Sequence, residues 1–467
     1  MDSIWTKSAD MPEFPELETE LHTQVLIIGG GLTGILCAYF LQQAGVDYCL
    51  LEKNRICSGI TCGTTAKITA QHGLIYGKLL QEKGAETAEQ YLRANLLAVE
   101  EYRRLGSKIA CEMEEKNACV YSVSDRSELE WELTALDRLG FPAKFVDYPA
   151  LPFRTEGAVC FPHQLQFHPL RFAGGLAASL NIYENSGVRR MTEHLAITEK
   201  GSVTADKIIV ATHFPFINTR GVYFMKLYQE RACVTAWRQA PDVDGMYIDA
   251  APDGLSLRNY KNFLLIGGGS HRTGKTVRRT SPHRSSGVPE EYSRESAFAR
   301  EFFRSRTADW GLRKLKTEAA RCFPTAEFAG AWAAQDCMSL DGIPYIGPYS
   351  PSTPELFVAA GYNKWGMTGS MVSAMLLSDL VQEKENMFSG LFSPKRRNLT
   401  PQLAVNLLEA IKGIAKPTLR GRCSHMGCVL KWNPEEKTWE CPCHGSRFGP
   451  NGAVLDNPAG KPLRKIP

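Results

Sequence analysis

The chain has 467 residues, 43% of them hydrophobic, which is enough for two or three domains with buried cores. Its formal net charge of +4 is too small, and too dispersed, to argue for binding to nucleic acid or to a membrane. The N-terminus lacks the basic and apolar regions of a signal peptide, and no run of about eighteen apolar residues follows. We therefore expect a cytoplasmic protein without a membrane span.

The first predicted unit is a strand, a glycine turn, a helix and a second strand. Val25–Ile28 is a short apolar run typical of a buried parallel strand, and it leads directly into the turn at Gly29–Gly34. A helical pattern over 35–45 follows, and the second strand, Tyr48–Leu51, ends in the acidic residue Glu52. This order is the βαβ pattern of a dinucleotide-binding site.

Each glycine of this turn has a physical role in binding a dinucleotide. Gly29 permits the tight turn, Gly31 lets the backbone approach a pyrophosphate, and Gly34 allows close helix–strand contact. The helix N-terminus favours the phosphates, and Glu52 can accept a hydrogen bond from a ribose hydroxyl.

The middle of the chain alternates helical and strand-like patterns. We expect helices over 88–103, 127–139 and 297–303, and strands over 118–122, 233–237 and 263–266. Gly269–Thr276 satisfies the P-loop pattern, but the Pro-rich and Gly-rich residues after it do not form the required helix. We therefore exclude nucleotide hydrolysis. The basic residues Arg272, Lys275, Arg278 and Arg279 fit a solvated loop, or the edge of a path for an anionic substrate.

Three later segments decide between FAD and NAD. A strand over 205–210 ends in Ala211-Thr212, a turn follows at Asp341–Pro348, and a strand over 356–361 leads into a glycine-bracketed loop over 363–368. In order and spacing, these segments and the glycine turn resemble the D-amino-acid oxidase, glycine oxidase and sarcosine oxidase family of flavoproteins over most of residues 20–390. The resemblance implies an α/β, FAD-binding two-domain fold in which an antiparallel substrate domain is inserted twice.

The resemblance also implies where FAD is held. The helix after the loop would aim its positive end at the flavin N1–C2=O edge, a role that falls to Gly366, Met367 and Thr368. The remaining FAD contacts carried over from the family are Leu32, Thr33, Lys53, Val188, Ala211, Thr212, Gly342, Gly347, Gly361, Asn363 and Trp365.

The segment after Glu52 departs from the better-known family members. In place of their Ser/Gly/Asn-rich stretch it reads Thr64-Thr65-Ala66-Lys67, which we predict to contact FAD. Lys67 could approach the flavin N5 or the substrate, or could be a surface lysine, and with Arg258 it is a candidate catalytic residue. His72 could attach the flavin covalently or act as a base, but a hydrogen-bonded core histidine is the simpler interpretation.

The C-terminal region carries a metal-ligand pattern. Cys423-Ser-His425 is followed after fifteen residues by Cys441-x-x-His444, and each loop has one extra cysteine, Cys428 or Cys443. Two thiolates and two imidazoles are what a Rieske [2Fe–2S] cluster requires, whereas a zinc site is the alternative. Zinc would not account for the extra pair. The motif resembles the Rieske family, which implies that Cys423 and Cys441 bind one iron, His425 and His444 bind the other, and a disulfide joins Cys428 to Cys443.

Further residues extend this resemblance. Pro458-Ala459 is similar to the loop that covers the cluster, and Ser446 occupies the position of a hydroxyl donor to a cluster sulfide. Phe448 stands where higher-potential members have tyrosine, so we expect an intermediate potential. Only residues 417–422 precede the first loop, which predicts a truncated, all-β module that depends on the rest of the chain to fold.

The remaining ten of the 14 cysteines stand singly in apolar segments; Cys37, Cys49, Cys160 and Cys322 are examples. This distribution is typical of buried thiols in a reducing compartment, so we expect them to be free.

These patterns predict a division of the chain. The FAD-binding domain takes residues 20–83, 148–219 and 326–390, and the substrate domain takes 84–147 and 220–325. A linker with an amphipathic helix spans 391–416, and the Rieske module spans 417–467.

The predicted function is that of a FAD-dependent dehydrogenase for a small amine-like or amino-acid-like substrate. Because the cluster holds a single electron, it would pass electrons singly to an external acceptor protein, and we expect poor use of oxygen. The alternative is an electron-transfer or redox-sensing protein without its own substrate. An open cavity lined by polar residues such as Lys67, Arg258 or Tyr260 would favour the enzyme.

Overall fold

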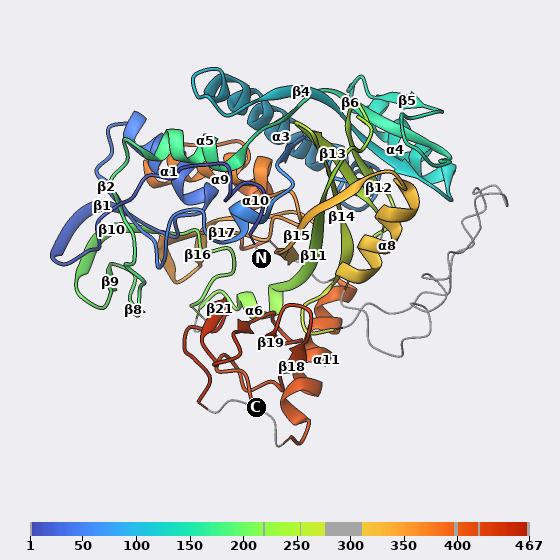
Figure 1. Ribbon diagram of the computed structural model, residues 1–467. Helices are drawn as coiled ribbons and strands as arrows, with labels where there is room; N and C mark the ends of the chain where they lie inside the picture. Colours follow the sequence, from blue (N-terminus) through green and yellow to red (C-terminus); the bar gives the residue numbers. More distant parts are fainter. Residues whose placement is uncertain are drawn as a thin grey trace.

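The computed structural model describes residues 2–217, 220–252, 254–275, 311–396, 400–418 and 421–464. In these residues three sheets and their helices form a main body and a small C-terminal module beneath it (Figure 1). The predicted helix over 297–303, the end of the P-loop-like segment, and Arg278 and Arg279 lie outside the described residues.

The first sheet contains the predicted βαβ unit. Its strand order is β16-β17-β10-β1-β2-β7, with β1, β2, β7, β10 and β17 parallel. Off this order, β9 pairs with the start of β10, and β8 pairs with β9. Its strands are β1 (Glu20–Ile28), β2 (Tyr48–Leu51), β7 (Ile182–Tyr183), β8 (Arg190–Met191), β9 (Leu195–Ile197), β10 (Ser202–Val210), β16 (Tyr345–Ser350) and β17 (Thr353–Ala360). The central strands are apolar and buried because helices cover the sheet.

Helices α1 (Leu32–Gln43) and α9 (Gly366–Val381) pack together beside this sheet, and α9 also packs against α3 (Ala85–Gly106). Both α1 and α9 are apolar on nearly all sides, as buried helices are. The remaining helices are α2 (Ile75–Lys83), α4 (Arg126–Arg138), α5 (Pro169–Ala177), α6 (Tyr223–Lys226), α8 (Leu312–Cys322) and α10 (Ser389–Phe392). The helices predicted over 88–103 and 127–139 are confirmed as α3 and α4.

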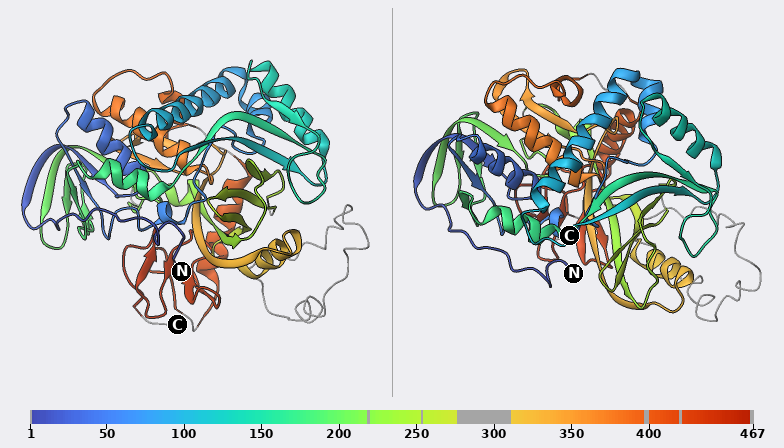
Figure 2. Two further views of the ribbon diagram at one scale, coloured as in Figure 1. Left: turned by 45° about the horizontal axis from the view of Figure 1, so that its top comes forward. Right: turned by 90° about the horizontal axis from the view of Figure 1, so that it is seen from above.

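The second sheet is mostly antiparallel, in the order β15-β11-β14-β13-β12-β4-β6-β3, with β5 also paired to β6. Its strands are β3 (Lys67–Ile68), β4 (Glu114–Ser122), β5 (Lys144–Val146), β6 (Gly157–Gln166), β11 (Leu227–Arg238), β12 (Met246–Asp249), β13 (Ser256–Tyr260), β14 (Phe263–Arg272) and β15 (Glu327–Ser339). The two sheets lie side by side (Figure 2). Segments expected in the FAD-binding part supply β3, β6 and β15 to this sheet, and the domain bounds stay a prediction.

One prediction about cysteines is wrong. Cys119 and Cys160 form a disulfide, although both were expected as free thiols. The two residues are opposite each other in the antiparallel pair of β4 and β6. Their separation of 41 residues conceals this contact, because only the strand register brings the two sulfurs together.

The C-terminal module is a four-stranded sheet, β18-β19-β20-β21, preceded by helix α11 (Pro401–Ala415). Its strands are β18 (Lys431–Asn433), β19 (Thr438–Glu440), β20 (Arg447–Phe448) and β21 (Val454–Asp456). The sheet is too small to enclose a large core, which agrees with the expected truncated all-β module. Among the described residues, no helix is long and apolar enough to cross a membrane.

Candidate functional site

A cavity of about 1460 Å³ lies between the two large sheets and reaches the C-terminal module. The glycine turn and the start of α9 form one part of its wall, and β11, β12, β14 and β15 form another. Ser424, His425 and the segment 453–462 of the C-terminal module complete it. One space therefore joins the predicted dinucleotide site to the predicted cluster loops.

The glycine turn is packed as tightly as its sequence predicts. Gly29 has φ +114°, and a Cβ there would stand 2.5 Å from the carbonyl oxygen of Ala211. At Gly34 a Cβ would stand 1.9 Å from the carbonyl oxygen of Gly29, so only glycine lets α1 approach β1 this closely. Glu52 accepts a hydrogen bond from the Gly30 backbone N–H at 2.7 Å. The acidic residue thus lies at the turn, on the cavity wall.

Most of the predicted FAD contacts share this cavity. Those on its wall are Gly29, Gly31, Leu32, Thr33, Glu52, Lys53, Thr64, Thr65, Lys67, Val188, Ala211, Thr212, Trp365, Gly366 and Met367. Those that do not line it are Gly34, Ala66, Gly342, Gly347, Gly361, Asn363 and Thr368. Asn363 instead accepts a hydrogen bond from the Ser339 N–H at 2.8 Å and so supports the loop before α9.

The two candidate catalytic residues have different surroundings. The Lys67 ammonium lines the cavity and donates to the Tyr247 carbonyl at 3.0 Å and to the Ser256 hydroxyl. Burial, together with the nearby Arg258 guanidinium, lowers the pKa of Lys67 well below its usual value. Arg258 lies behind the wall, where it donates to the Ala66 carbonyl at 2.7 Å. Burial lowers its pKa to about 9. Arg258 and Tyr260 do not line the cavity.

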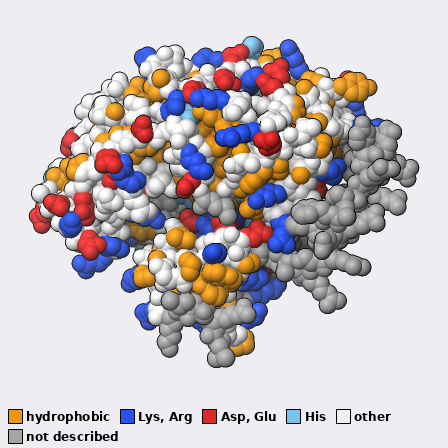
Figure 3. All heavy atoms as spheres, viewed as in Figure 1, with side chains coloured by type: hydrophobic (Ala, Val, Ile, Leu, Met, Phe, Trp, Pro, Cys, Tyr) orange, Lys and Arg blue, Asp and Glu red, His pale blue; other side chains and the backbone are white. Residues whose placement is uncertain are grey.

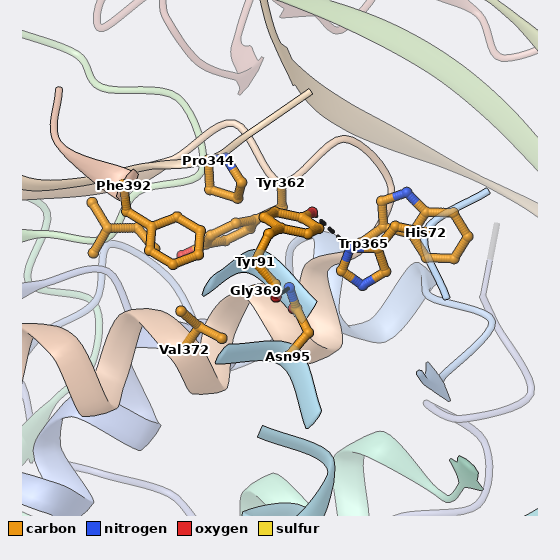
Figure 4. Close-up of a pocket in the computed structure, with 10 residues that line it drawn as sticks. His72, Tyr91, Asn95, Pro344, Tyr362, Trp365, Gly369, Val372 and Phe392 are labelled. Atoms are coloured by element: carbon orange, nitrogen blue, oxygen red, sulfur yellow. Dashed lines mark hydrogen bonds between the residues drawn. The ribbon is translucent and has the colours of Figure 1, made fainter. Parts of the chain in front are cut away.

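His72 is a hydrogen-bonded core histidine. Its Nδ1 is 2.7 Å from the Tyr91 hydroxyl (Figure 4), and its Nε2 is 2.9 Å from the Thr368 hydroxyl. The ring also stacks on Trp365 at 4.8 Å. Burial lowers the pKa of His72 to about 3, so the ring is neutral. His72 lies on the cavity wall and holds the segment after β3 against the start of α9.

Two charged residues that no sequence pattern indicates, Lys364 and Asp336, line the cavity. Lys364 forms an ion pair with Glu230 at 2.9 Å and donates to the Ser270 hydroxyl at 3.0 Å. Asp336 lines the same wall, and burial raises its pKa to about 6 despite the opposing effect of Lys364. Asp336 stands between the buried residues Gln335 and Cys337, on the less buried side of β15, where strand alternation permits a polar residue, so the sequence carried no signal for it.

The four predicted iron ligands lie close together in the C-terminal module. The His425 and His444 rings are 5.0 Å apart and nearly perpendicular. His444 is 2% exposed, and its Nδ1 has no hydrogen-bond partner. A buried imidazole nitrogen without a partner is costly unless it binds a metal, so this atom fits an iron ligand.

The cysteines of both loops converge at the same place. The sulfurs of Cys428, Cys441 and Cys443 all lie within 4.8 Å of one another, and Cys423 is buried beside them. All four are free thiols in the structure, so the predicted Cys428–Cys443 bridge stays a prediction. Ser446 is fully buried at the loops, where its hydroxyl accepts from the Ala459 N–H at 3.1 Å.

Buried polar side chains from the main body hold the cluster loops in place. Gln229 donates to the carbonyls of His444 and Asn457, both at 2.8 Å. Gln335 donates to the Gly445 carbonyl at 2.9 Å and to the Gln229 side-chain oxygen at 2.6 Å. These contacts agree with the expectation that the truncated module depends on the rest of the chain.

The comparisons with known proteins identify both parts. The family model "FAD dependent oxidoreductase" matches residues 24–380, and the model "Rieske [2Fe-2S] domain" matches residues 412–467. The Rieske 2Fe-2S iron-sulfur protein YhfW of Bacillus subtilis is 32% identical over 100% of this chain and 97% of its own.

Two solved structures share the fold of the main body. Glycine oxidase from Geobacillus kaustophilus has a TM-score of 0.60 at 21% identity, covering 81% of this chain and 99% of its own. L-proline dehydrogenase from P. horikoshii has a TM-score of 0.64 at 16% identity, covering 82% of this chain and 98% of its own.

The two family models give FAD and a [2Fe–2S] cluster as the cofactors of this enzyme. The chain belongs to the FAD-dependent oxidoreductase family and carries a Rieske domain at its C-terminus.

Proposed function

We propose that this oxidoreductase is a dehydrogenase that oxidises a small amine-like or amino-acid-like substrate and delivers the electrons singly to an external acceptor protein. The observation that carries the proposal is the shared cavity, whose wall includes both the glycine turn and His425. When bound, FAD supplies two-electron hydride acceptance, and the [2Fe–2S] cluster supplies one-electron transfer.

The size of the cavity supports an enzyme over a simple carrier. At about 1460 Å³ it exceeds the roughly 300–1,000 Å³ of ordinary small-molecule pockets. A cavity of this size can hold a dinucleotide and a small substrate together. A redox carrier without its own substrate would not need the additional space.

The side chains on the second-sheet wall favour an amine. Asp249 and Asp336 line that wall, and carboxylates attract a cationic amine. Asp336, with a pKa of about 6, can also take up a proton when the substrate loses one. Lys67 donates hydrogen bonds to the Tyr247 carbonyl and the Ser256 hydroxyl, and so it ties β3 to strands β12 and β13 of the same sheet.

The test is anaerobic mixing of the purified holoprotein with a panel of amines and amino acids. A substrate should bleach the flavin absorbance, and the Rieske electron-paramagnetic signal of the reduced cluster should appear with it. A reduced flavin beside an oxidised cluster, with rapid turnover on oxygen, would contradict the proposal. Failure of every compound to bleach a flavin that dithionite does reduce would favour the carrier instead.

A further inference from the structure

Helix α11 is held against the cluster loops by one side only. A Cβ at Gly413 would stand 2.3 Å from the Cys443 sulfur, so the helix packs directly on the loops. Asn406 accepts from Arg272 at 3.0 Å, and Glu409 pairs with Lys275 at 2.7 Å. The polar side chains of α11 therefore face inward, toward the rest of the protein.

The opposite side of α11 is apolar, and the described residues leave it about half exposed. Its five large aliphatic side chains are between 43% and 53% exposed: Val405, Leu407, Leu408, Ile411 and Ile414. This is the reverse of an ordinary surface helix, which buries its apolar stripe. The helix lies at the lower edge of the molecule (Figure 1), and we call its five exposed aliphatic side chains the apolar ridge.

The border of this ridge is basic. Lys412 and Lys416 are exposed at the C-terminal end of the helix, and Lys431 is exposed on the neighbouring strand β18. Partial burial is the main cause that lowers the pKa of Lys431, and the nearby Lys275 and Lys416 add to it. Glu409, the one acidic residue of α11, is already paired with Lys275. Basic and hydrophobic side chains lie next to one another on the module in Figure 3.

We propose that α11 binds the surface of an anionic lipid bilayer, with its apolar ridge among the acyl chains and Lys412, Lys416 and Lys431 at the phosphate headgroups. An aliphatic ridge with a cationic border is the pattern of an interfacial helix. The 15 residues of α11 are too few to cross a bilayer, which takes about 20. Protein interfaces instead favour Tyr, Trp and Arg anchors, and the ridge has none of them.

This orientation would place the cluster beside the membrane. The cluster loops touch the inward side of α11 at Gly413, and a helix is about 10 Å across. A bound bilayer would then be separated from the loops by one helix. The small net charge of the whole chain does not reveal this property, because the basic residues act through their position around one apolar ridge.

The test is sedimentation of the full-length holoprotein with vesicles, read without turnover. Vesicles of phosphatidylcholine mixed with phosphatidylglycerol should bind the protein, and phosphatidylcholine alone should bind it weakly. Leu408→Asp should lower the partition coefficient by about tenfold or more, since one buried leucine contributes about 1.5–3 kcal/mol. Lys412→Gln should lower it about fivefold on anionic vesicles only.

Leu97→Asp is the matched control, because Leu97 on α3 is 45% exposed and lies far from the ridge in sequence and fold. It should leave binding unchanged. Flavin absorbance and the Rieske signal of each variant establish that it is folded. Equal binding of the wild type and Leu408→Asp would overturn the proposal. So would a concentration-dependent dimer that Leu408→Asp abolishes in the absence of vesicle binding, since the ridge would then pair with a second copy of the chain.

Discussion

At the scale of single residues, the structure supports the predicted histidine ligand His444 more directly than the predicted cysteine ligands. His444 is buried with an Nδ1 that no donor or acceptor satisfies. The cysteines are ambiguous by position alone, because the sulfurs of Cys428, Cys441 and Cys443 all lie within 4.8 Å of one another. Mutation can separate the two that bind iron from the two that are predicted to form a disulfide.

Replacing His444 with alanine should abolish the Rieske electron-paramagnetic signal and leave FAD bound, because the glycine turn belongs to a different sheet. Spectroscopy and the FAD-to-protein ratio check both results. Cys423→Ser should prevent cluster assembly, whereas Cys428→Ser should only shorten the lifetime of the cluster. The reverse order of these two cysteine variants would show that the assignment is wrong, and zinc in the native site would refute the cluster.

Asp336 should give the protein a pH-dependent stability. Burial raises the pKa of this carboxyl from 3.8 to about 6, so the folded state binds the proton more tightly than the unfolded state. The contribution of Asp336 to the free energy of unfolding is therefore most favourable below pH 3.8. It declines as the pH rises to about 6, by at most about 3 kcal/mol. Asp336→Asn should remove this decline. Thermal unfolding followed by flavin fluorescence across this range compares the two proteins, and parallel pH profiles would contradict the assignment.

At the scale of elements, strands β11 and β15 position the cluster loops. Their register places Gln335 opposite Arg231, and the Gln335 amide reaches both Gln229 and the loop carbonyl of Gly445. The Gln229 and Gln335 amides, on two neighbouring strands, are thus hydrogen-bond donors at a fixed spacing. The loop that accepts from both of them keeps its position relative to the cavity.

Gln335→Leu should loosen the cluster loops selectively. It leaves the Gly445 carbonyl without its buried donor, which costs about 1–3 kcal/mol. The cluster should then be lost faster to a chelator while FAD stays bound, as followed by absorbance. Gln164→Leu is the control, because Gln164 is equally buried but bonds within β6 and to Ala70. Equal cluster lifetimes in the two variants would refute the positioning role.

At the scale of the whole molecule, a buried ionic network joins the module to the main body. Arg231 from β11 pairs with Glu436, which also pairs with Arg447 at 2.7 Å. Arg447 in turn pairs with Asp456 at 2.7 Å. Glu436, Arg447 and Asp456 all belong to the module, so the Arg231–Glu436 pair is the link of this network that depends on docking.

Arg231→Met should weaken docking by about 3–5 kcal/mol, because it leaves the Glu436 charge buried with less compensation. We expect calorimetry to show an earlier transition for the module, and Arg231→Met combined with Glu436→Gln to restore much of the loss. Arg126→Met, which removes exposed pairs with Glu130 and Asp147, should change stability by less than about 1 kcal/mol. An unchanged single transition in Arg231→Met would mean that the network does not hold the module.

Local patterns in the sequence were sufficient to predict the cofactors and many of the helices and strands. The glycine turn, its strands and Glu52 are close in sequence, so their geometry follows from a few consecutive dihedral angles. The same is true of the cluster loops, where each loop is predicted to supply one thiolate and one imidazole. The predicted strand over 48–51 and the helices over 88–103 and 127–139 likewise follow from local periodicity.

Tertiary structure alone decided which distant residues meet. Arg258 has a plausible sequence position but lies behind the cavity wall, whereas Asp336 and Lys364, which no motif indicates, line it. Strand register joined Cys119 to Cys160, and the packing of α11 on the loops turned its aliphatic side outward. The physical reason is common to all of these: sequence periodicity specifies that a face is apolar or polar, but only long-range packing determines what that face contacts.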